Sequence, residues 1–367
     1  MIDIVFNKKE FEYDAYTLIK AFYPQEEVSI LYEGEEKTEA FQEKEEAFLV
    51  VKITYNKEDT RLEILKNKET VFEETIFLAS DDERKERKNK LKQALYRGLS
   101  KETKKVLPWG DLTGIRPTKI AMGLIESGMS NVETAEFMRN TYYTSNEKTA
   151  LAITIANRER ALLADIDYKN GYSLYVGIPF CPSICLYCSF SSYPLAKWRD
   201  KVDAYLDALC KELTYIGETM KVRTLDTIYI GGGTPTTLEP EQLERLLSHI
   251  ECCFPTREVK EYTIEAGRPD SITREKLEVI RKYPVTRISV NPQTMNQATL
   301  DLIGRRHTVE DTRHAFALAR ECGFDNINMD LIVGLPGECA KDVQKTLEEV
   351  KKMEPDSLTV HSLAIKR

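Results

Sequence analysis

Apolar runs of strand type alternate with amphipathic helical patterns throughout the second half of the chain. The runs cover residues 172–178, 226–231, 260–265, 285–291, 325–333 and 357–362. The helical patterns between them cover residues 198–219, 240–252, 273–282, 308–322 and 340–353. Strands joined by helices at this rhythm form right-handed crossovers and pack into a buried parallel sheet. We therefore predict an α/β fold, a partial barrel or a doubly wound sheet, with functional residues at the carboxyl ends of the strands.

The first half of the chain has a different pattern. Short β-rich runs such as "AFLVVKITY" come first, and helical patterns follow from residue 83. We expect a smaller α+β, then helical, domain of unknown role over residues 1–168 and a second domain over residues 169–367. The segment "WGDLTGIRPTK" contains Arg116 and Lys119, which either contact a substrate or belong to a helix that begins at Pro117.

Composition and charge exclude several classes of protein. A formal net charge of -8 argues against a partner whose binding depends on phosphate neutralisation, so no nucleic acid is expected. The chain has neither a long apolar run for a membrane span nor a signal-peptide pattern at its start, which predicts a cytoplasmic protein. In the cytosol, the 8 cysteines are metal ligands, catalytic groups or free thiols rather than disulfides. These patterns leave the oligomeric state open.

Three cysteines directly follow the first predicted strand. Cys181, Cys185 and Cys188 lie in "GIPFCPSICLYCSF", and the second strand ends in "GGGTPTTL", whose glycines let the backbone approach a ligand closely. Three thiolates on an iron–sulfur cluster leave one iron open to a further ligand. The alternatives are a zinc site, which usually has four ligands, and three incidental thiols. The other cysteines lie in predicted helices and are interpreted as packing or surface thiols.

The cysteine spacing, the preceding "YVGIPF" and the glycine segment resemble the radical S-adenosylmethionine (SAM) enzymes. With "EAGRPD" and the later strand ends, they resemble the oxygen-independent coproporphyrinogen III oxidase (dehydrogenase) family, in its HemZ-like branch. The resemblance implies a partial (β/α)6 radical-SAM barrel with a [4Fe-4S] cluster and S-adenosyl-L-methionine as cofactors. It implies an oxidoreductase that cleaves SAM to a 5'-deoxyadenosyl radical and oxidatively decarboxylates coproporphyrinogen III propionates to vinyl groups in anaerobic haem biosynthesis.

The same resemblance assigns the site residues. Cys181, Cys185 and Cys188 would hold the cluster, and no further catalytic residue is assigned. The implied SAM contacts are Tyr175, Tyr187, Gly232, Gly233, Thr234, Glu265, Gln293, Arg305, Asp330 and Ala364. Their chemistry agrees with this, because an ammonium and a ribose need polar acceptors and a carboxylate suits a bidentate arginine. His307 and His361 are interpreted as structural residues.

The resemblance also implies partners: a porphyrinogen or another small-molecule substrate, and a one-electron reductant such as flavodoxin or ferredoxin. Carboxylates of the substrate would need cations, for which the candidates are Arg116, Lys119, Arg268 and Arg306.

Two departures from the family pattern keep other functions open. The family's oxidases carry a fourth cysteine two residues after the third, where this chain has Phe190, and its members continue beyond the equivalent of Arg367. We therefore expect this chain to lack a C-terminal extension. The alternative functions are a haem-binding or haem-delivery protein without decarboxylase activity and a radical SAM enzyme for another substrate.

Overall fold

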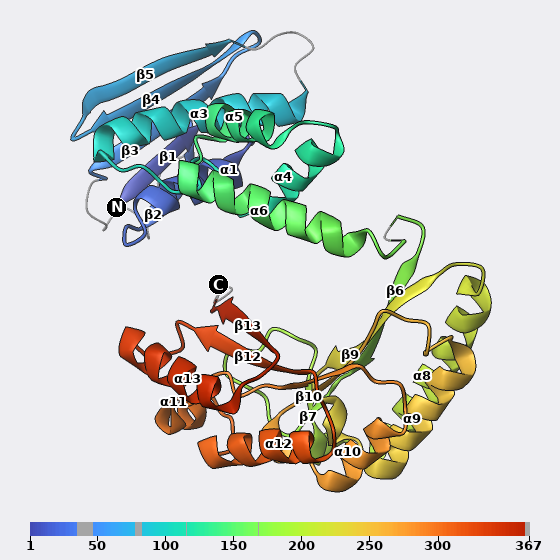
Figure 1. Cartoon of the computed structure of the whole chain (residues 1–367). Coiled ribbons are helices and arrows are strands. Elements are labelled where there is room, and N and C mark those ends of the chain that lie inside the picture. Colours follow the sequence, from blue (N-terminus) through green and yellow to red (C-terminus); the bar gives the residue numbers. More distant parts are fainter. Residues whose placement is uncertain (35–46, 78–82, 115, 168, 364–367) are drawn as a thin grey trace. The chain divides into compact units, whose positions relative to one another are not determined.

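The chain divides into two units, Met1–Ala164 and Asp165–Arg367, whereas the sequence placed the boundary after residue 168. The computed structural model describes residues 1–34, 47–77, 83–114, 116–167 and 169–363 (Figure 1). Each unit has a large apolar core of its own. We describe the two units separately.

Six parallel strands build the main sheet of the second unit. In chain order they are β6 (Tyr172–Ile178), β9 (Leu225–Gly232), β10 (Glu261–Gly267), β11 (Arg287–Val290), β12 (Ile327–Val333) and β13 (Ser357–Ser362). Each strand pairs in parallel with the next one along the chain. The sheet curls without closing (Figure 1), which confirms the predicted α/β partial barrel.

Helices cover the outer face of this sheet, as expected for right-handed crossovers. They are α8 (Val202–Met220), α9 (Pro240–Cys253), α10 (Arg274–Arg281), α12 (Val309–Glu321) and α13 (Ala340–Met353). Shorter elements lie in the loops: β7 (Phe180–Cys181), β8 (Tyr193–Pro194), α7 (Leu195–Trp198), η1 (Arg199–Lys201), η2 (Pro235–Thr237), η3 (Pro269–Ser271) and α11 (Gln297–Leu302). The predicted strands and crossover helices are all present, whereas α11 was not predicted.

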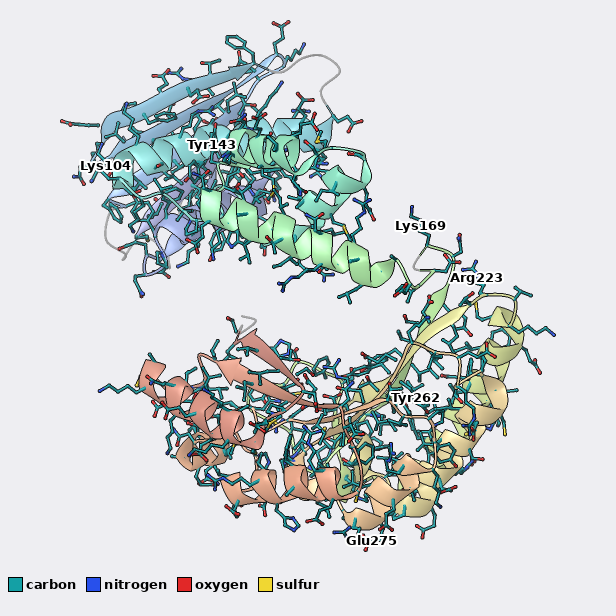
Figure 2. All side chains as sticks on the ribbon, in the orientation of Figure 1. Lys104, Tyr143, Lys169, Arg223, Tyr262 and Glu275 are labelled. Carbon is teal, nitrogen blue, oxygen red and sulfur yellow. The ribbon has the colours of Figure 1, made fainter. Side chains whose placement is uncertain are left out.

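The core of the second unit lies between sheet and helices. Ile228, Ile230 and Ile264 are buried there against leucines of α8 and α9. Tyr262 belongs to the same core and lies among closely packed side chains (Figure 2). Because side chains alternate across a strand, the residues between these apolar positions face the inside of the barrel. This alternation gives the inner face of the sheet its polar residues.

The first unit begins with a mixed five-stranded sheet of order β2-β1-β3-β4-β5. The strands are β1 (Ile2–Phe6), β2 (Val28–Tyr32), β3 (Leu49–Tyr55), β4 (Asp59–Lys66) and β5 (Glu69–Phe77). β1 runs parallel to β2 and β3, and β3, β4 and β5 form an antiparallel meander. Helices α1 (Glu12–Phe22) and α3 (Arg84–Thr103) bury apolar side chains such as Phe22 and Leu95 in the core of this sheet.

Three more helices complete the first unit: α4 (Pro117–Glu126), α5 (Asn131–Tyr142) and α6 (Asn146–Leu163). They share a small core that includes Ala121, Met138 and Ala152. Helix α4 begins at Pro117, so the predicted helix start at this residue is confirmed. Over the described ranges, we find no helix with the length and apolar character that a membrane crossing needs.

Candidate functional site

The three cysteines lie in the loop after β6. Cys181 is buried in the short strand β7, and the Thr234 hydroxyl donates a hydrogen bond of 3.6 Å to its sulfur. Cys185 and Cys188 are partly exposed and are joined by a backbone hydrogen bond of 3.0 Å from the Cys188 N–H to the Cys185 carbonyl. The Leu186 N–H donates to the Ile303 carbonyl at 3.0 Å, which ties this loop to the end of α11.

The thiols are close enough to influence one another. Burial raises the pKa of Cys181, the Thr234 hydroxyl opposes that rise, and the nearby Cys185 and Cys188 add to it. Within the described ranges, no three His, Cys, Asp or Glu side chains lie where they could share one metal ion. A single zinc ion needs every sulfur within about 2.3 Å of one point, whereas a cluster binds each thiolate through a different iron.

The glycines after β9 bring backbone close to the first cysteine. Gly232 has a φ of 106°, a conformation that side chains rarely adopt. The Gly233 N–H donates to the Ile178 carbonyl at 2.7 Å. A Cβ atom on Gly233 would lie 2.6 Å from the Phe180 carbonyl oxygen and 3.0 Å from the Cys181 sulfur. This close approach explains why glycine is needed at position 233.

A cavity of about 530 Å³ lies at the carboxyl ends of the strands, beside the third cysteine. Its lining comes from the cysteine loop and from β6, β9, β10, β12, β13 and the segment after β11. The predicted SAM contacts in this lining are Tyr175, Tyr187, Gly232, Glu265, Gln293 and Asp330, and Cys188 is the predicted cluster ligand there. The structure therefore brings together residues that are up to 155 positions apart, from 175 to 330.

Two acidic side chains dominate the electrostatics of the cavity. Burial and, to a smaller extent, the nearby Asp330 carboxylate raise the pKa of Glu265 to about 7. The Gly232 N–H, Arg305 and the Asn291 amide, which donates to Glu265 at 3.2 Å, act in the opposite direction. A bound cation would relieve the repulsion between the two carboxylates, so the cavity favours positively charged ligands.

Gln293 has a strained backbone at the cavity wall. Its φ of 69° lies in the left-handed region although it is not a glycine. Two hydrogen bonds of 2.9 Å hold it there, from the Gln293 N–H to the Asp330 carbonyl and from the Ile332 N–H to the Gln293 carbonyl. Its side-chain oxygen is buried and lacks a hydrogen-bond partner among the residues that the structure describes. An acceptor of this kind suits the hydroxyl or amino group of a ligand.

An aromatic pair forms another part of the wall. Tyr175 and Tyr229 are register partners on β6 and β9, and their rings stack 5.7 Å apart at 8°. Tyr229 was not predicted as a site residue. The alternation of side chains along a strand could have found it. Tyr229 lies two residues before Gly231, the first glycine of the "GGGTPTTL" segment, and therefore faces the same side of the strand. Other lining residues without a predicted cofactor role are Ser189, Phe190, Ile332, His361, Ser362 and Leu363.

Some predicted cofactor residues do not line this cavity. Gly233 and Thr234 contact the Cys181 segment instead. Arg305 is buried, donates to the Asn291 carbonyl, and lies beside Cys185 and Tyr187, which raise the pKa of Arg305 against the opposing effect of burial. Ala364 lies outside the described residues.

The candidate substrate cations are distributed over both units. Arg268, one of these candidates, is buried: its side chain is 3% exposed and pairs with Asp270 at 2.8 Å. It also donates to the Ser183 hydroxyl at 2.7 Å, which anchors the cysteine loop. Arg306 is exposed and lines an open cavity of about 750 Å³ next to that loop.

Arg116 and Lys119 line a cavity within the first unit. Of the two histidines interpreted as structural, His307 is buried. His361 lines the cavity at the strand ends that contains Glu265 and Asp330, which we call the acidic cavity.

Comparisons with known proteins identify the family. The model of the Radical SAM superfamily matches residues 175–350. The oxygen-independent coproporphyrinogen-III oxidase-like protein HemZ of Bacillus subtilis is 38% identical over 353 residues, which cover 93% of this chain and 69% of that protein. The chain belongs to the oxygen-independent coproporphyrinogen III oxidase-like family of radical SAM proteins, in its HemZ branch. The predicted family is thus confirmed.

Other relatives match mainly the barrel unit. The heme chaperone HemW of Bacillus subtilis is 38% identical over 194 residues, which cover 53% of this chain and 50% of that protein. The solved coproporphyrinogen III oxidase HemN of Escherichia coli is 32% identical, with a TM-score of 0.50, and the match covers 56% of this chain and 47% of that one. The chain therefore spans about two thirds of the HemZ-like relative and half or less of these others.

Membership of the radical SAM superfamily agrees with the predicted cofactors, an iron–sulfur cluster and SAM. The side chains present fit both groups. Three neighbouring thiols can serve different irons of one cluster. SAM carries a sulfonium and an ammonium, and the acidic pair beside Cys188 suits these charges.

Proposed function

We propose that the protein is a radical SAM oxidoreductase that acts on propionate side chains of a porphyrinogen. The observation that carries this proposal is the acidic cavity at the strand ends, which has Cys188 in its wall. An enzyme of this class needs an open iron and a SAM site in contact with each other. The similarity to the coproporphyrinogen III oxidase HemN and to the oxidase-like protein HemZ supports this substrate class.

In this proposal Cys181, Cys185 and Cys188 hold the cluster, and Arg268 and Thr234 fix the loop that carries them. Glu265 and Asp330 accept the ammonium of SAM, and the backbone of Gly232 lets the methionine end approach closely. When both groups are bound, the cluster supplies the electron that cleaves SAM.

The remaining residues position and protect the cofactor. The buried side-chain oxygen of Gln293 accepts a hydrogen bond from the ribose. The stacked rings of Tyr175 and Tyr229 cover one wall and reduce the access of water to the reacting centre. Arg305, which lies beside Cys185 and Tyr187, supports the cysteine loop and adds positive charge next to the cluster.

A second candidate function is haem binding and delivery. One residue favours it: Phe190, at the position where the family's oxidases carry a fourth cysteine, is 70% exposed and lines the cavity. An exposed aromatic ring suits contact with a flat apolar ligand better than redox chemistry. The similarity to heme chaperone HemW supports this candidate over the same barrel.

One experiment separates the two functions. The full chain is reconstituted anaerobically with iron and sulfide, reduced, and given SAM with or without coproporphyrinogen III. We expect 5'-deoxyadenosine and carbon dioxide to form together and only with the porphyrinogen. Stable binding of haem in a 1:1 ratio without carbon dioxide release would favour the delivery function instead. Formation of 5'-deoxyadenosine without carbon dioxide release and without haem binding would indicate a radical SAM enzyme with another substrate.

The proposed role of Glu265 predicts a pH dependence of SAM binding. The pKa of Glu265 is about 7 and the groups that face it are Asp330, Arg305, Asn291 and the Gly232 N–H. Below pH 7 this carboxyl group is protonated and accepts the ammonium poorly, so affinity should rise as the pH rises. If SAM binds only to the form of the protein in which Glu265 is ionised, its affinity increases about tenfold between pH 6 and pH 8. Equilibrium dialysis with the oxidised protein measures this change.

The Glu265→Gln variant tests the assignment. It should lose this pH dependence and bind SAM about 10 to 100 times more weakly at pH 8, because a charged hydrogen bond is lost. Glu218→Gln, which makes the same chemical change at an exposed site in α8, should behave like the parent protein. An unchanged pH profile in Glu265→Gln would exclude the carboxyl group as the ammonium acceptor.

A further inference from the structure

A second cavity, of about 520 Å³, lies entirely within the first unit. Its walls come from α1, α3, α4, α5 and the segment between α3 and α4. The proposed radical chemistry uses none of its residues. Five residues of the "WGDLTGIRPTK" segment that the sequence singled out line it: Asp111, Leu112, Thr113, Arg116 and Lys119.

Positive charge exceeds negative charge around this cavity. The cationic residues in its lining are Lys85, Lys88, Lys92, Arg116 and Lys119, and the acidic ones are Asp14 and Asp111. Lys88 lies 3.8 Å from Asp14, which neutralises one of the cations. Among the described residues, Lys85, Arg116 and Lys119 form no ion pair. This excess of positive charge favours an anionic ligand.

Two charged side chains in the lining of the cavity are buried. The exposed fractions are 7% for Lys92 and 1% for Asp111. The Lys92 ammonium donates to the Thr113 hydroxyl at 3.2 Å, and one carboxylate oxygen of Asp111 lacks a hydrogen-bond partner among the residues that the structure describes. A buried polar atom without a partner is unfavourable, so a ligand that supplies the missing hydrogen bond is favoured.

The ionisation of this pair supports a ligand that interacts with both groups. Burial raises the pKa of Asp111 to about 7, although Lys92 opposes this rise. Burial also lowers the pKa of Lys92, although Asp111 and Asp14 oppose that change. The two groups therefore interact without making a direct ion pair in the structure. A ligand with an acidic group and a hydrogen-bond donor would stabilise the charged form of both.

We propose that this cavity binds a small organic anion that also carries a hydroxyl or amino group. Lys92, Arg116 and Lys119 receive its phosphate or carboxylate group, and the free oxygen of Asp111 accepts its donor hydrogen. Apolar contacts come from Leu112, Ile120, Leu124 and Phe137. A volume of about 520 Å³ is in the range of small-molecule sites, which are typically about 300 to 1,000 Å³.

Binding is tested on the full chain by isothermal titration calorimetry at constant ionic strength, with three probes. Ribose 5-phosphate has a phosphate and hydroxyls, citrate has carboxylates and a hydroxyl, and sulfate has charge without a donor. We expect saturable 1:1 binding of at least one of the first two probes, and sulfate should bind at least tenfold more weakly. Tighter binding of ribose 5-phosphate assigns a phosphate ligand, and tighter binding of citrate assigns a carboxylate ligand.

Variants of exposed residues keep the test independent of folding. The double variant Arg116→Gln/Lys119→Gln should bind the organic probe with an affinity at least about tenfold lower, because two cations of the site are lost. Lys57→Gln/Lys101→Gln removes the same charge from exposed sites that do not line the cavity, and should bind like the parent. The site is overturned if neither organic probe binds saturably, or if both double variants bind with equal affinity.

The Asp111→Asn variant tests the second half of the proposal. An amide oxygen accepts hydrogen bonds less strongly than a carboxylate, so affinity for the organic probe should fall while affinity for sulfate stays the same or rises. An equal loss for both kinds of probe would overturn the role of Asp111 as acceptor. Circular dichroism of each variant confirms that the comparison is made between folded proteins.

Discussion

Replacing Cys185 with serine is expected to reduce both the bound iron and the SAM cleavage of the reconstituted protein to background. Cys185 is one of only three thiols in the loop after β6, so its loss leaves two sulfur ligands for the cluster. A serine hydroxyl remains protonated near neutral pH and is a poor iron ligand, whereas a thiolate binds iron strongly. Iron analysis, the visible absorption of the cluster and the yield of 5'-deoxyadenosine measure the effect.

Cys252→Ser is the matched control. Cys252 is exposed near the end of α9, does not line the acidic cavity, and should keep the iron content and activity of the parent protein. Cys185 is partly exposed, so serine at this position should leave the apolar core and the circular dichroism spectrum unchanged. Full iron content in Cys185→Ser would contradict the proposed ligand set.

The fold of the second unit was predictable because its pattern is strong. Buried parallel strands read as continuous apolar runs, as in the strand predicted at 325–333, which is observed as β12, Ile327–Val333, with most of its residues buried. Helix α11 was missed because its six residues, Gln297–Leu302, are too few to show a helical period. The pattern therefore reveals long elements with a buried face and not the short ones that connect them.

The candidate site was predictable only where a local motif carries it. The three cysteines lie within residues 181–188 and the three glycines are consecutive at 231–233, so each motif can be read locally. The strand order then brings Glu265 and Asp330 to the same cavity as Cys188 and Gly232. Tyr229 was missed because its contact with Tyr175 depends on the register between two strands. The positive φ of Gln293 is set by hydrogen bonds to β12, which residue type alone does not reveal.

Charged residues were the hardest to assign from sequence. Arg268 was a candidate for substrate contact. In the structure its guanidinium group is occupied by Asp270, two residues away, and by Ser183, 85 residues earlier in the chain. For Arg116 and Lys119 the sequence offered a helix start or a ligand contact. The structure has the helix, and the same residues line a cavity, so the two interpretations are compatible.

Replacing Gly233 with alanine is expected to disturb the cysteine loop, because the added methyl group would meet its backbone. The added Cβ would lie 2.6 Å from the Phe180 carbonyl oxygen, 2.8 Å from that of Ile178 and 3.0 Å from the Cys181 sulfur. Two of these atoms belong to the backbone and accept hydrogen bonds from the Gly233 and Thr234 N–H groups, so relief of the clash would weaken this pairing. Overpacking of this kind costs about 1 to 3 kcal/mol.

The effect should appear in both stability and function. We expect the free energy of unfolding to fall by that amount in denaturant titrations, and SAM cleavage to fall by at least about tenfold, because the displaced segment carries Cys181. Gly177→Ala is the matched control on the neighbouring strand: its Cβ would meet the Tyr175 ring at an ordinary 3.7 Å, so both quantities should stay close to those of the parent. Equal behaviour of the two variants would show that the backbone at Gly233 does not determine the position of Cys181.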